Sequence, residues 1–306
     1  MEIKQVHKLL SGGILTFPIS IVLAFLARIF YGISIYEYES WLVFGIQTGI
    51  AFLLLRINYE YQIIKKRTFL PAAFFMLFTA SNPVLYSNKE GSVSALIMCL
   101  CLVLAFKSYH HSKSQLNSFN IALLLTVGSV CCWRPLLLFI PLFWIGFKWF
   151  RSLNIRTFFA SILGILTVYL FLYAWSLFNN DLNFFYGKIP YDKTMFLVKL
   201  IELQWYDWIV VAFFICLLIL SAIEIFVLGL SEKIRTTFFF KFLYLLVVAL
   251  FVFTCFFDSM VNDIQTIIYL SIAFISGFYF AINESKLATY LLIFTILFFA
   301  VSYVVR

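Results

Sequence analysis

The sequence predicts an all-α protein: a polytopic transmembrane helical bundle of about 11 spans, with a cytoplasmic N-terminus and a periplasmic C-terminus. Composition, the length of the apolar runs and the placement of basic residues support this prediction. Hydrophobic residues make up 64% of the 306 residues, charged residues only 12%, and the mean hydropathy is +1.01. A soluble domain carries about 25% charged residues. So few charges cannot cover a water-exposed surface, which indicates an integral membrane protein.

Apolar runs separated by polar breaks give the number of spans. A helix needs about 20 mostly apolar residues to cross a hydrocarbon core of ~30 Å. Helices are the expected spanning elements because a lipid-exposed strand would leave its amides unpaired. The first run contains Pro18 and lacks the small-residue exit of a cleaved signal, so we interpret it as a retained span. The eleven candidate runs are 10–33, 41–58, 69–86, 92–107, 118–133, 135–150, 157–177, 207–229, 238–257, 264–282 and 287–305.

The basic residues orient these spans. With the N-terminus inside, the predicted outer segments hold seven of the 22 basic residues and the inner segments hold the other 15, as the positive-inside rule requires. The seven are Arg28, Lys89, Arg134, Lys188, Lys193, Lys199 and Arg306. Residues 1–306 therefore form a single transmembrane domain. Residues 178–206 form its one long outer loop, where an apolar side along Thr194–Trp205 predicts a short amphipathic interfacial helix.

Several chemistries have no support in the sequence. It contains no phosphate-binding, dinucleotide-binding, zinc-protease or serine-hydrolase motif. The six cysteines fall within apolar runs and the three histidines within basic segments, without metal-ligand spacing. We therefore expect no metal and no cofactor. The net charge of +8 follows the membrane topology, so we expect no nucleic acid partner.

A break at Cys131–Pro141, read CCWRPLLLFIP, predicts a site. Basic residues on both flanks place both ends inside, so the break is a hairpin tip at the outer side, with Pro135 starting the returning helix. Both arms are short, so Arg134 could lie below the headgroups, where it needs an anionic partner or a water-filled recess. The alternative is a turn residue that snorkels to the interface. A second shallow break, Asn82-Pro83, leads to Lys89. Arg134, Lys89 and Arg28 are the candidate lipid- or anion-binding residues.

Other charged residues near the spans have structural interpretations. Arg28 precedes Glu37 and Glu39, which predicts ion pairing within the outer rim. Arg56 and Glu60 are four residues apart, as in a helical ion pair. Glu224, near the inner end of its span, either snorkels to the interface or takes part in proton relay.

Part of the chain resembles an uncharacterised family of polytopic inner-membrane proteins of Bacteroidota. The resemblance is carried by FLPAAFFMLFTASNPVL (69–85), FNIALLLTVGSVCCWRPLLLFIPLFWIGF (119–147) and FRSLNIRTFFASILGILTVYLF (150–171). It implies a multi-pass protein of a bacterial inner membrane. It implies no particular activity.

A weaker likeness is to the membrane glycosyltransferases that use polyprenyl-phosphate sugars. Arg28 near the outer end of the first span, the acidic stretch YEYESW (36–41) and the outer turn at Asn82-Pro83 carry it. The likeness implies that Glu37 or Glu39 acts as general base on an acceptor. It also implies that Arg134 and Lys89 hold the lipid phosphate.

Three function classes remain open on the sequence. The first is a non-catalytic polytopic subunit or assembly factor of an envelope-associated complex, with membrane lipids and a membrane protein as partners and an outward-facing lipid or anion recess. No catalytic residue is assigned in this class. The second is the lipid-linked transferase, with Glu37 and Glu39 as its catalytic candidates. The third is a lipid or solute transporter that depends on Arg134 or Glu224.

Overall fold

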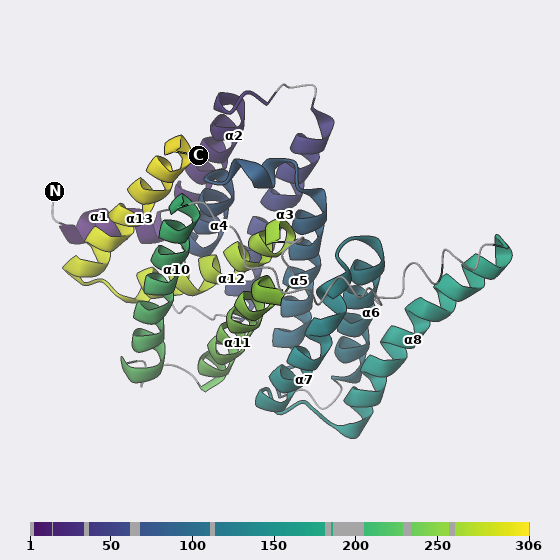
Figure 1. Cartoon of the computed structure of the whole chain (residues 1–306). Helices are drawn as coiled ribbons and strands as arrows, with labels where there is room; N and C mark the ends of the chain where they lie inside the picture. The colour runs from purple at the N-terminus through teal and green to yellow at the C-terminus, as the bar shows by residue number, and fades with distance from the viewer. Residues whose placement is uncertain are drawn as a thin grey trace.

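The chain folds into a bundle of α-helices joined mostly by short connections (Figure 1). The computed structural model describes residues 3–13, 15–33, 37–61, 68–110, 114–180, 185, 205–228, 234–256 and 261–305. These ranges hold twelve α-helices and no strand, so the all-α fold class is confirmed. The helices are α1 (Ile3–Gly12), α2 (Thr16–Phe30), α3 (Tyr38–Tyr61), α4 (Leu70–Ala80), α5 (Lys89–Lys107), α6 (Gln115–Cys131), α7 (Ile140–Trp149), α8 (Ile155–Phe178), α10 (Trp205–Ile223), α11 (Ile234–Phe256), α12 (Val261–Ile282) and α13 (Lys286–Val305). Two 3-10 segments, η1 (Pro83–Tyr86) and η2 (Arg134–Phe139), and a π-helical turn, η4 (Glu224–Leu228), lie between them.

The helices differ in length more than the apolar runs predict. Seven described helices are long and apolar enough to cross a membrane, each with 19 to 24 residues. By contrast, α2, α4 and α6 are apolar but have only 15, 11 and 17 residues. Helix α7 has 10 residues and follows the six of η2. The predicted count of about 11 spans is therefore not confirmed. The cause is local: Asn82-Pro83 follows the end of α4, and Pro135 imposes a 3-10 start on the segment before α7.

Contacts between distant segments agree with the predicted alternation of the chain. Glu39 and Lys89, at the beginnings of α3 and α5, are predicted outer residues and form an ion pair. Thr68, before α4, donates a hydrogen bond of 2.7 Å to the Ser11 carbonyl oxygen in α1, and both are predicted inner residues. The first four predicted runs therefore alternate between the two ends of the bundle. Which end faces the cytoplasm stays a prediction.

Helix α12 is the centre of the bundle. Of the 18-residue apolar stretch of α12, 94% is buried, and the helix contacts α4, α5, α10 and α11. It lies close to α4 at Gly277, where an added Cβ would be 2.7 Å from the backbone nitrogen of Pro71. Stacked and tilted aromatic rings fill the space on either side, among them Phe74 and Phe280 with centroids 5.5 Å apart. A residue without a side chain is therefore required at this crossing.

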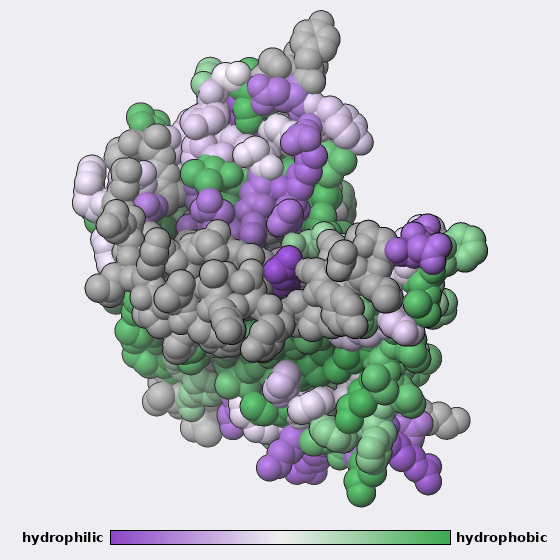
Figure 2. All heavy atoms as spheres, turned by 45° about the vertical axis from the view of Figure 1, so that its right-hand side comes forward, coloured by the Kyte–Doolittle hydropathy of each residue, from purple (hydrophilic) through white to green (hydrophobic). Residues whose placement is uncertain are grey.

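One face of the bundle carries a band of apolar surface (Figure 2). In Figure 2 hydrophobic side chains form a belt across the face in view, with hydrophilic side chains gathered above it and a second group below it. The upper end in this view is the end at which α2 and α3 are joined (Figure 1). A hydrophobic belt between two polar zones is the surface expected of a bilayer-embedded protein. Together with the seven long apolar helices, it defines a multi-pass membrane protein.

Helix α8 departs from the bundle. It packs along α6 near its beginning, where Ser118 donates a hydrogen bond of 2.8 Å to the carbonyl oxygen of Thr157. Only 17% of the most apolar stretch of α8 is buried. Towards the end of the helix, Phe171 and Trp175 are 78% and 62% exposed. Figure 1 shows α8 leaning away from the other helices. The interfacial helix predicted after it falls on residues outside the described ranges.

The crossing of α12 and α4 gives a stability prediction. Gly277→Ala should lower the free energy of unfolding by about 1–3 kcal/mol, because the added methyl group meets the Pro71 backbone, which has little freedom to move. The measurement is the thermal unfolding midpoint in detergent. Gly49→Ala is the matched control: no atom lies within 4 Å of its Cβ position, and alanine favours a helix over glycine. A midpoint for Gly277→Ala equal to that of the control would contradict the prediction.

Candidate functional site

The charged candidates at the predicted outer end are centred on Arg28, in the last turn of α2. Its side chain is fully buried, with 0% exposure. Nη2 donates a hydrogen bond of 2.6 Å to Oε1 of Gln47, and Nη1 donates one of 3.3 Å to the carbonyl oxygen of Ala24. The guanidinium lies over the rings of Phe44 and Tyr86, 4.7 and 4.4 Å from their centroids. The buried cation is therefore held by an amide, a carbonyl and two aromatic faces.

This arrangement differs from the ion pairing predicted for Arg28. Among the described residues, no carboxylate forms an ion pair with its guanidinium. Gln47 instead continues the network, because its Nε2 lies 3.5 Å from the hydroxyl oxygen of Ser92 in α5. The network thus joins α2, α3 and α5. Because Arg28 has no exposed surface, an anion would reach it only if its aromatic neighbours moved.

Lys89 and Glu39 are the two candidate residues that the structure brings together. Nζ of Lys89 lies 2.5 Å from Oε1 of Glu39, and their side chains are 40% and 67% exposed. The pair connects the beginnings of α3 and α5. Glu37, just before α3, is exposed. The rim therefore exposes one cation, Lys89, and two carboxylates to solvent. One of the carboxylates, Glu39, is ion-paired with Lys89.

The first turn of α5 also holds the beginning of α12. The Asn88 side chain accepts a hydrogen bond of 2.8 Å from the Gly91 amide and is hydrogen-bonded to the carboxyl group of Asp263. A Cβ on Gly91 would lie 2.9 Å from the Cα of Asp263, so the two backbones are close. Two residues further along α12, Oε1 of Gln265 accepts a hydrogen bond of 2.8 Å from Nδ2 of Asn82. These polar contacts fix the α4–α5 connection against α12.

Arg134 lies on the other predicted hairpin. Helix α6 ends at Cys131 and η2 begins at Arg134, so the predicted hairpin break is where the sequence indicates it. The Arg134 side chain is half-buried, and its carbonyl oxygen accepts a hydrogen bond of 2.6 Å from the Ser129 hydroxyl. Pro135 is buried in the first turn of η2, which is a 3-10 rather than an α-helical return.

The two hairpins reach different depths. Gly128, one turn before the end of α6, lies against Ile97 of α5 and Leu136 of η2, each 2.8 Å from its Cβ position. Ile97 is eight residues, or about 12 Å of helix, after Lys89. Helix α6 ends three residues, or about 4.5 Å, beyond Gly128, so its end lies about one and a half turns short of the start of α5. We name the predicted site at this step the outer recess, with Lys89 and Glu39 at its rim and Arg134 on the shorter hairpin.

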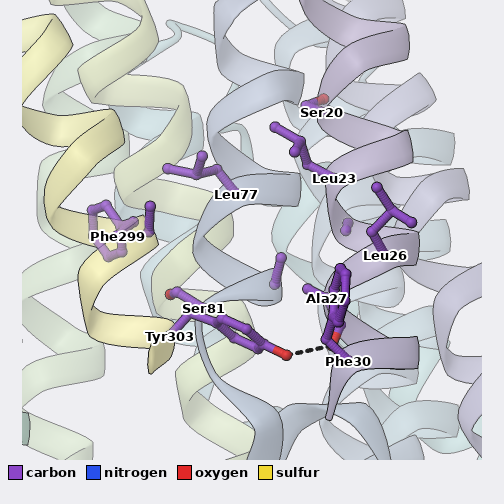
Figure 3. A pocket seen from close by; sticks show the side chains of 12 residues that line it. Ser20, Leu23, Leu26, Ala27, Phe30, Leu77, Ser81, Phe299 and Tyr303 are labelled. Atoms are coloured by element: carbon purple, nitrogen blue, oxygen red, sulfur yellow. Dashed lines mark hydrogen bonds between the residues drawn. The ribbon is translucent and has the colours of Figure 1, made fainter. Parts of the chain in front are cut away.

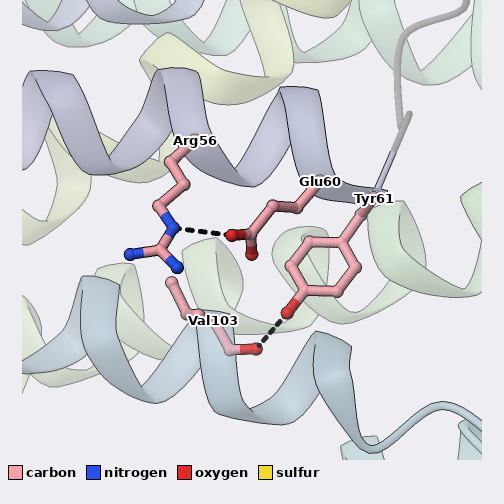
Figure 4. A network of polar contacts seen from close by, with 4 residues as sticks. All are labelled: Arg56, Glu60, Tyr61 and Val103. Atoms are coloured by element: carbon pink, nitrogen blue, oxygen red, sulfur yellow. Dashed lines mark hydrogen bonds and ion pairs between the residues drawn. The ribbon is translucent and has the colours of Figure 1, made fainter.

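Three charged residues lie at the opposite, predicted inner end. Nε of Arg56 lies 2.6 Å from Oε1 of Glu60, which confirms the predicted helical ion pair (Figure 4). The next residue, Tyr61, donates a hydrogen bond of 3.2 Å to the carbonyl oxygen of Val103. Glu224 begins the π-helical turn η4 and accepts a hydrogen bond of 3.2 Å from Asn283. Glu60 therefore forms a pair within α3, whereas Glu224 connects η4 to the residue that follows α12.

Sequence reasoning misses three features of this structure. Gln47 is the amide partner of Arg28, and its position as a lone amide in an apolar run was an available signal. His7 is buried and lies 3.2 Å from Thr289, although its basic segment suggests exposure. The third feature is an apolar groove of about 230 Å³ between α2, α4 and α13, closed at one end by Tyr303 (Figure 3). A groove depends on distances between helices, so no local pattern predicts it.

Comparison with known proteins adds no relative: no family model, curated protein or solved structure matches the chain. Within the described residues, no three His, Cys, Asp or Glu side chains are grouped to hold a metal ion. The fold and the apolar belt thus define the class, a multi-pass membrane protein with a polar network at one end. Its function follows from the contacts of that network.

The Arg28 network gives a second stability prediction. Gln47→Leu should cost about 2–3 kcal/mol, because it removes the amide acceptor from a buried guanidinium. Adding Arg28→Met should recover part of that loss, since a buried polar pair replaced by apolar residues can be nearly neutral. Thermal unfolding of the single and double variants in detergent measures both effects. Thr48→Val, which removes an exposed hydroxyl next to Gln47, is the control. A Gln47→Leu protein as stable as the control would contradict the role given to this network.

Proposed function

We propose that this multi-pass membrane protein is a non-catalytic subunit or assembly factor of an envelope-associated complex in a bacterial inner membrane, with a lipid- or anion-binding outer recess. The observation that carries the proposal is that charged groups at this end of the bundle are bonded to partners on neighbouring helices. Glu39 forms an ion pair with Lys89. Asp263 is hydrogen-bonded to Asn88, and Arg28 is hydrogen-bonded to Gln47. A general base must be able to accept a proton from its substrate. These groups instead join the ends of α2, α3, α5 and α12.

Helix α8 supports a protein partner within the membrane. A helix on the surface of a bundle normally buries one side, but the end of α8 exposes large side chains over most of its circumference, with only Ser176 buried there. Phe171, Tyr173, Trp175 and Phe178 are all exposed, between 43% and 84%. Large aromatic side chains are enriched in protein interfaces. We propose that a transmembrane helix of another envelope protein packs against this end of α8.

The partner proposal has a direct test. The chain is purified from its native membrane in mild detergent, and cross-linkers placed on α8 identify adjacent proteins. We expect one stoichiometric membrane protein, cross-linked through α8 and lost in the Phe171→Ala, Trp175→Ala double variant. The control is Tyr290→Ala with Phe294→Ala on α13, two aromatic residues with the same spacing that are 57% and 55% exposed. Purification of the chain alone, with no protein adduct from α8, would contradict the proposal.

A lipid-linked transferase is the second candidate, favoured by the position of Lys89 beside Glu39. An incoming lipid phosphate would compete for the lysine, because charge-assisted hydrogen bonds to phosphate are strong. Glu39 would then be released to accept a proton from the hydroxyl group of an acceptor. Glu37 lies two residues away and offers a second carboxylate, while Arg134 supplies a further cation in the recess. This candidate uses the same recess as the first but requires turnover.

The transferase has its own prediction. If it is the function, the Glu37→Gln, Glu39→Gln double variant should lose a glycan or glycolipid from the cellular profile, since an amide cannot act as a base. Lipid extracts and envelope glycans are compared by mass spectrometry between wild type and variant. Glu60→Gln, a change at the opposite end of α3, is the control. Identical profiles for wild type and the double variant would exclude the transferase and leave the non-catalytic proposal standing.

A further inference from the structure

We infer that the groove between α2, α4 and α13 holds one hydrocarbon chain of a lipid, and that the lipid's phosphate-bearing headgroup lies at the predicted outer end of the groove. This inference rests on the proposed lipid-binding function and names the ligand class. The cavity measures about 230 Å³. Its residues include Leu23 and Ala27 of α2, Leu77 and Ala80 of α4, and Phe299 of α13 (Figure 3).

The groove arises from the way the three helices pack. Helices α2 and α13 both contact α4, so α4 forms the floor and the other two form the walls. Small residues line the space, with Ala80 and Ser81 from the floor and Ala27 and Ala300 from the two walls. The walls are joined at one end, where the Tyr303 hydroxyl donates a hydrogen bond of 2.6 Å to the carbonyl oxygen of Ala27 (Figure 3).

Water is a poor occupant of this groove. A buried water needs two to four polar partners. The hydroxyl groups that line the groove donate their protons to backbone carbonyls: Ser20 to Phe17 at 2.7 Å, and Ser81 to Phe78 at 2.8 Å. The Tyr303 hydroxyl likewise donates to Ala27, and the other lining side chains are apolar. A hydrocarbon group therefore fits the surface better than water does.

The shape of the groove suits a single chain better than a helix. An α-helix is about 10 Å wide with its side chains, whereas the walls of the groove are close enough for Tyr303 of α13 to reach the Ala27 carbonyl of α2. A single alkyl or isoprenoid chain is narrower, and the groove is within reach of the bilayer. Leu23 and Phe30 line it and are 50% and 79% exposed on the apolar outside of α2. A chain could therefore enter sideways from the hydrocarbon region.

The predicted outer end of the groove suits a polar headgroup. Tyr31, just after α2, is 56% exposed and lies near Tyr303. Its ring meets the buried ring of Tyr86 edge-on, with centroids 5.8 Å apart, and Tyr86 in turn carries the Arg28 guanidinium on its face. The hydroxyl groups of Tyr303 and Tyr86 donate to the carbonyl oxygens of Ala27 and Ala80, so the donor offered to a headgroup is the Tyr31 hydroxyl, with the positive charge of Arg28 behind it. A phosphate diester or monoester is the headgroup chemistry that these groups favour.

The test maps the lipid directly. Wild type is placed in bilayer discs of phosphatidylethanolamine that contain, in separate arms, phosphatidylglycerol or a polyprenyl phosphate with a photoreactive diazirine near the chain end. We expect the cross-linked peptides to come mainly from α2, α4 and α13, in one or both arms. The arm that labels identifies the source of the chain. If all apolar helices, α8 included, were labelled equally in the wild-type protein, the inference would be overturned.

Substitutions that fill the groove with larger side chains give a second test of the same cross-linking. Ala80→Leu with Ala300→Leu should reduce labelling of α2, α4 and α13 by about fivefold, equivalent to ~1 kcal/mol of lost chain binding. Ala160→Leu with Ala174→Leu adds the same number of carbon atoms to α8 and should leave labelling unchanged. Unchanged labelling in a folded filled variant would overturn the inference.

Headgroup binding is measured separately, so that failure of the proposed function can be recognised. Native mass spectrometry counts phosphatidylglycerol retained by wild type and by the Lys89→Ala, Arg134→Ala double variant. If the double variant loses phosphatidylglycerol while its groove helices are still labelled by the lipid chain, the recess and the groove are both supported as independent contacts. Equal retention of anionic and zwitterionic lipid by wild type would count against the proposed recess, while the labelling map alone decides the groove.

Discussion

A cation buried among apolar helices sets the main constraint on this structure. An arginine inside a bilayer costs several kcal/mol unless its charge is compensated. Arg28 meets this cost through the Gln47 amide, a carbonyl of its own helix and two aromatic faces. Each partner must keep its position, since a lost partner leaves the guanidinium unsatisfied. Helices α2 and α3 and the 3-10 segment η1 are consequently held in one relative register, and Ser92 extends the constraint to α5.

The polar network and the aromatic core have complementary roles. Hydrocarbon tails solvate phenylalanine well, so apolar contact between helices gives little specificity in a membrane. Specific positions come from groups that lipid cannot satisfy and from close backbone approaches. Asn82 with Gln265, Asn88 with Asp263, and Gly277 against Pro71 are the examples at α12. Together they explain how a chain with 39 phenylalanines can adopt one arrangement.

Some of this could be predicted from the sequence, and the reasons for success and failure are physical. Composition and run length predict the class because the bilayer imposes them. The flanking basic residues predict the Arg134 hairpin, and the four-residue spacing predicts the Arg56–Glu60 pair. The partner of Glu39 is Lys89 rather than the expected Arg28, because pairing depends on which helix ends meet in space. The number of spans is not confirmed for a related reason: Asn-Pro and Arg-Pro shorten helices inside runs that still look apolar.

The unequal helices α6 and α8 have a consequence for the surrounding bilayer. Helix α6 has 17 residues and α8 has 24, so they extend for about 25 Å and 36 Å. They lie side by side, yet a flat bilayer matches only one of them. Hydrophobic mismatch of this size is relieved by tilt, which agrees with the lean of α8, or by a local change in lipid thickness. The molecule therefore creates a thickness gradient along one edge, and lipids of different chain length will partition unequally between its two sides.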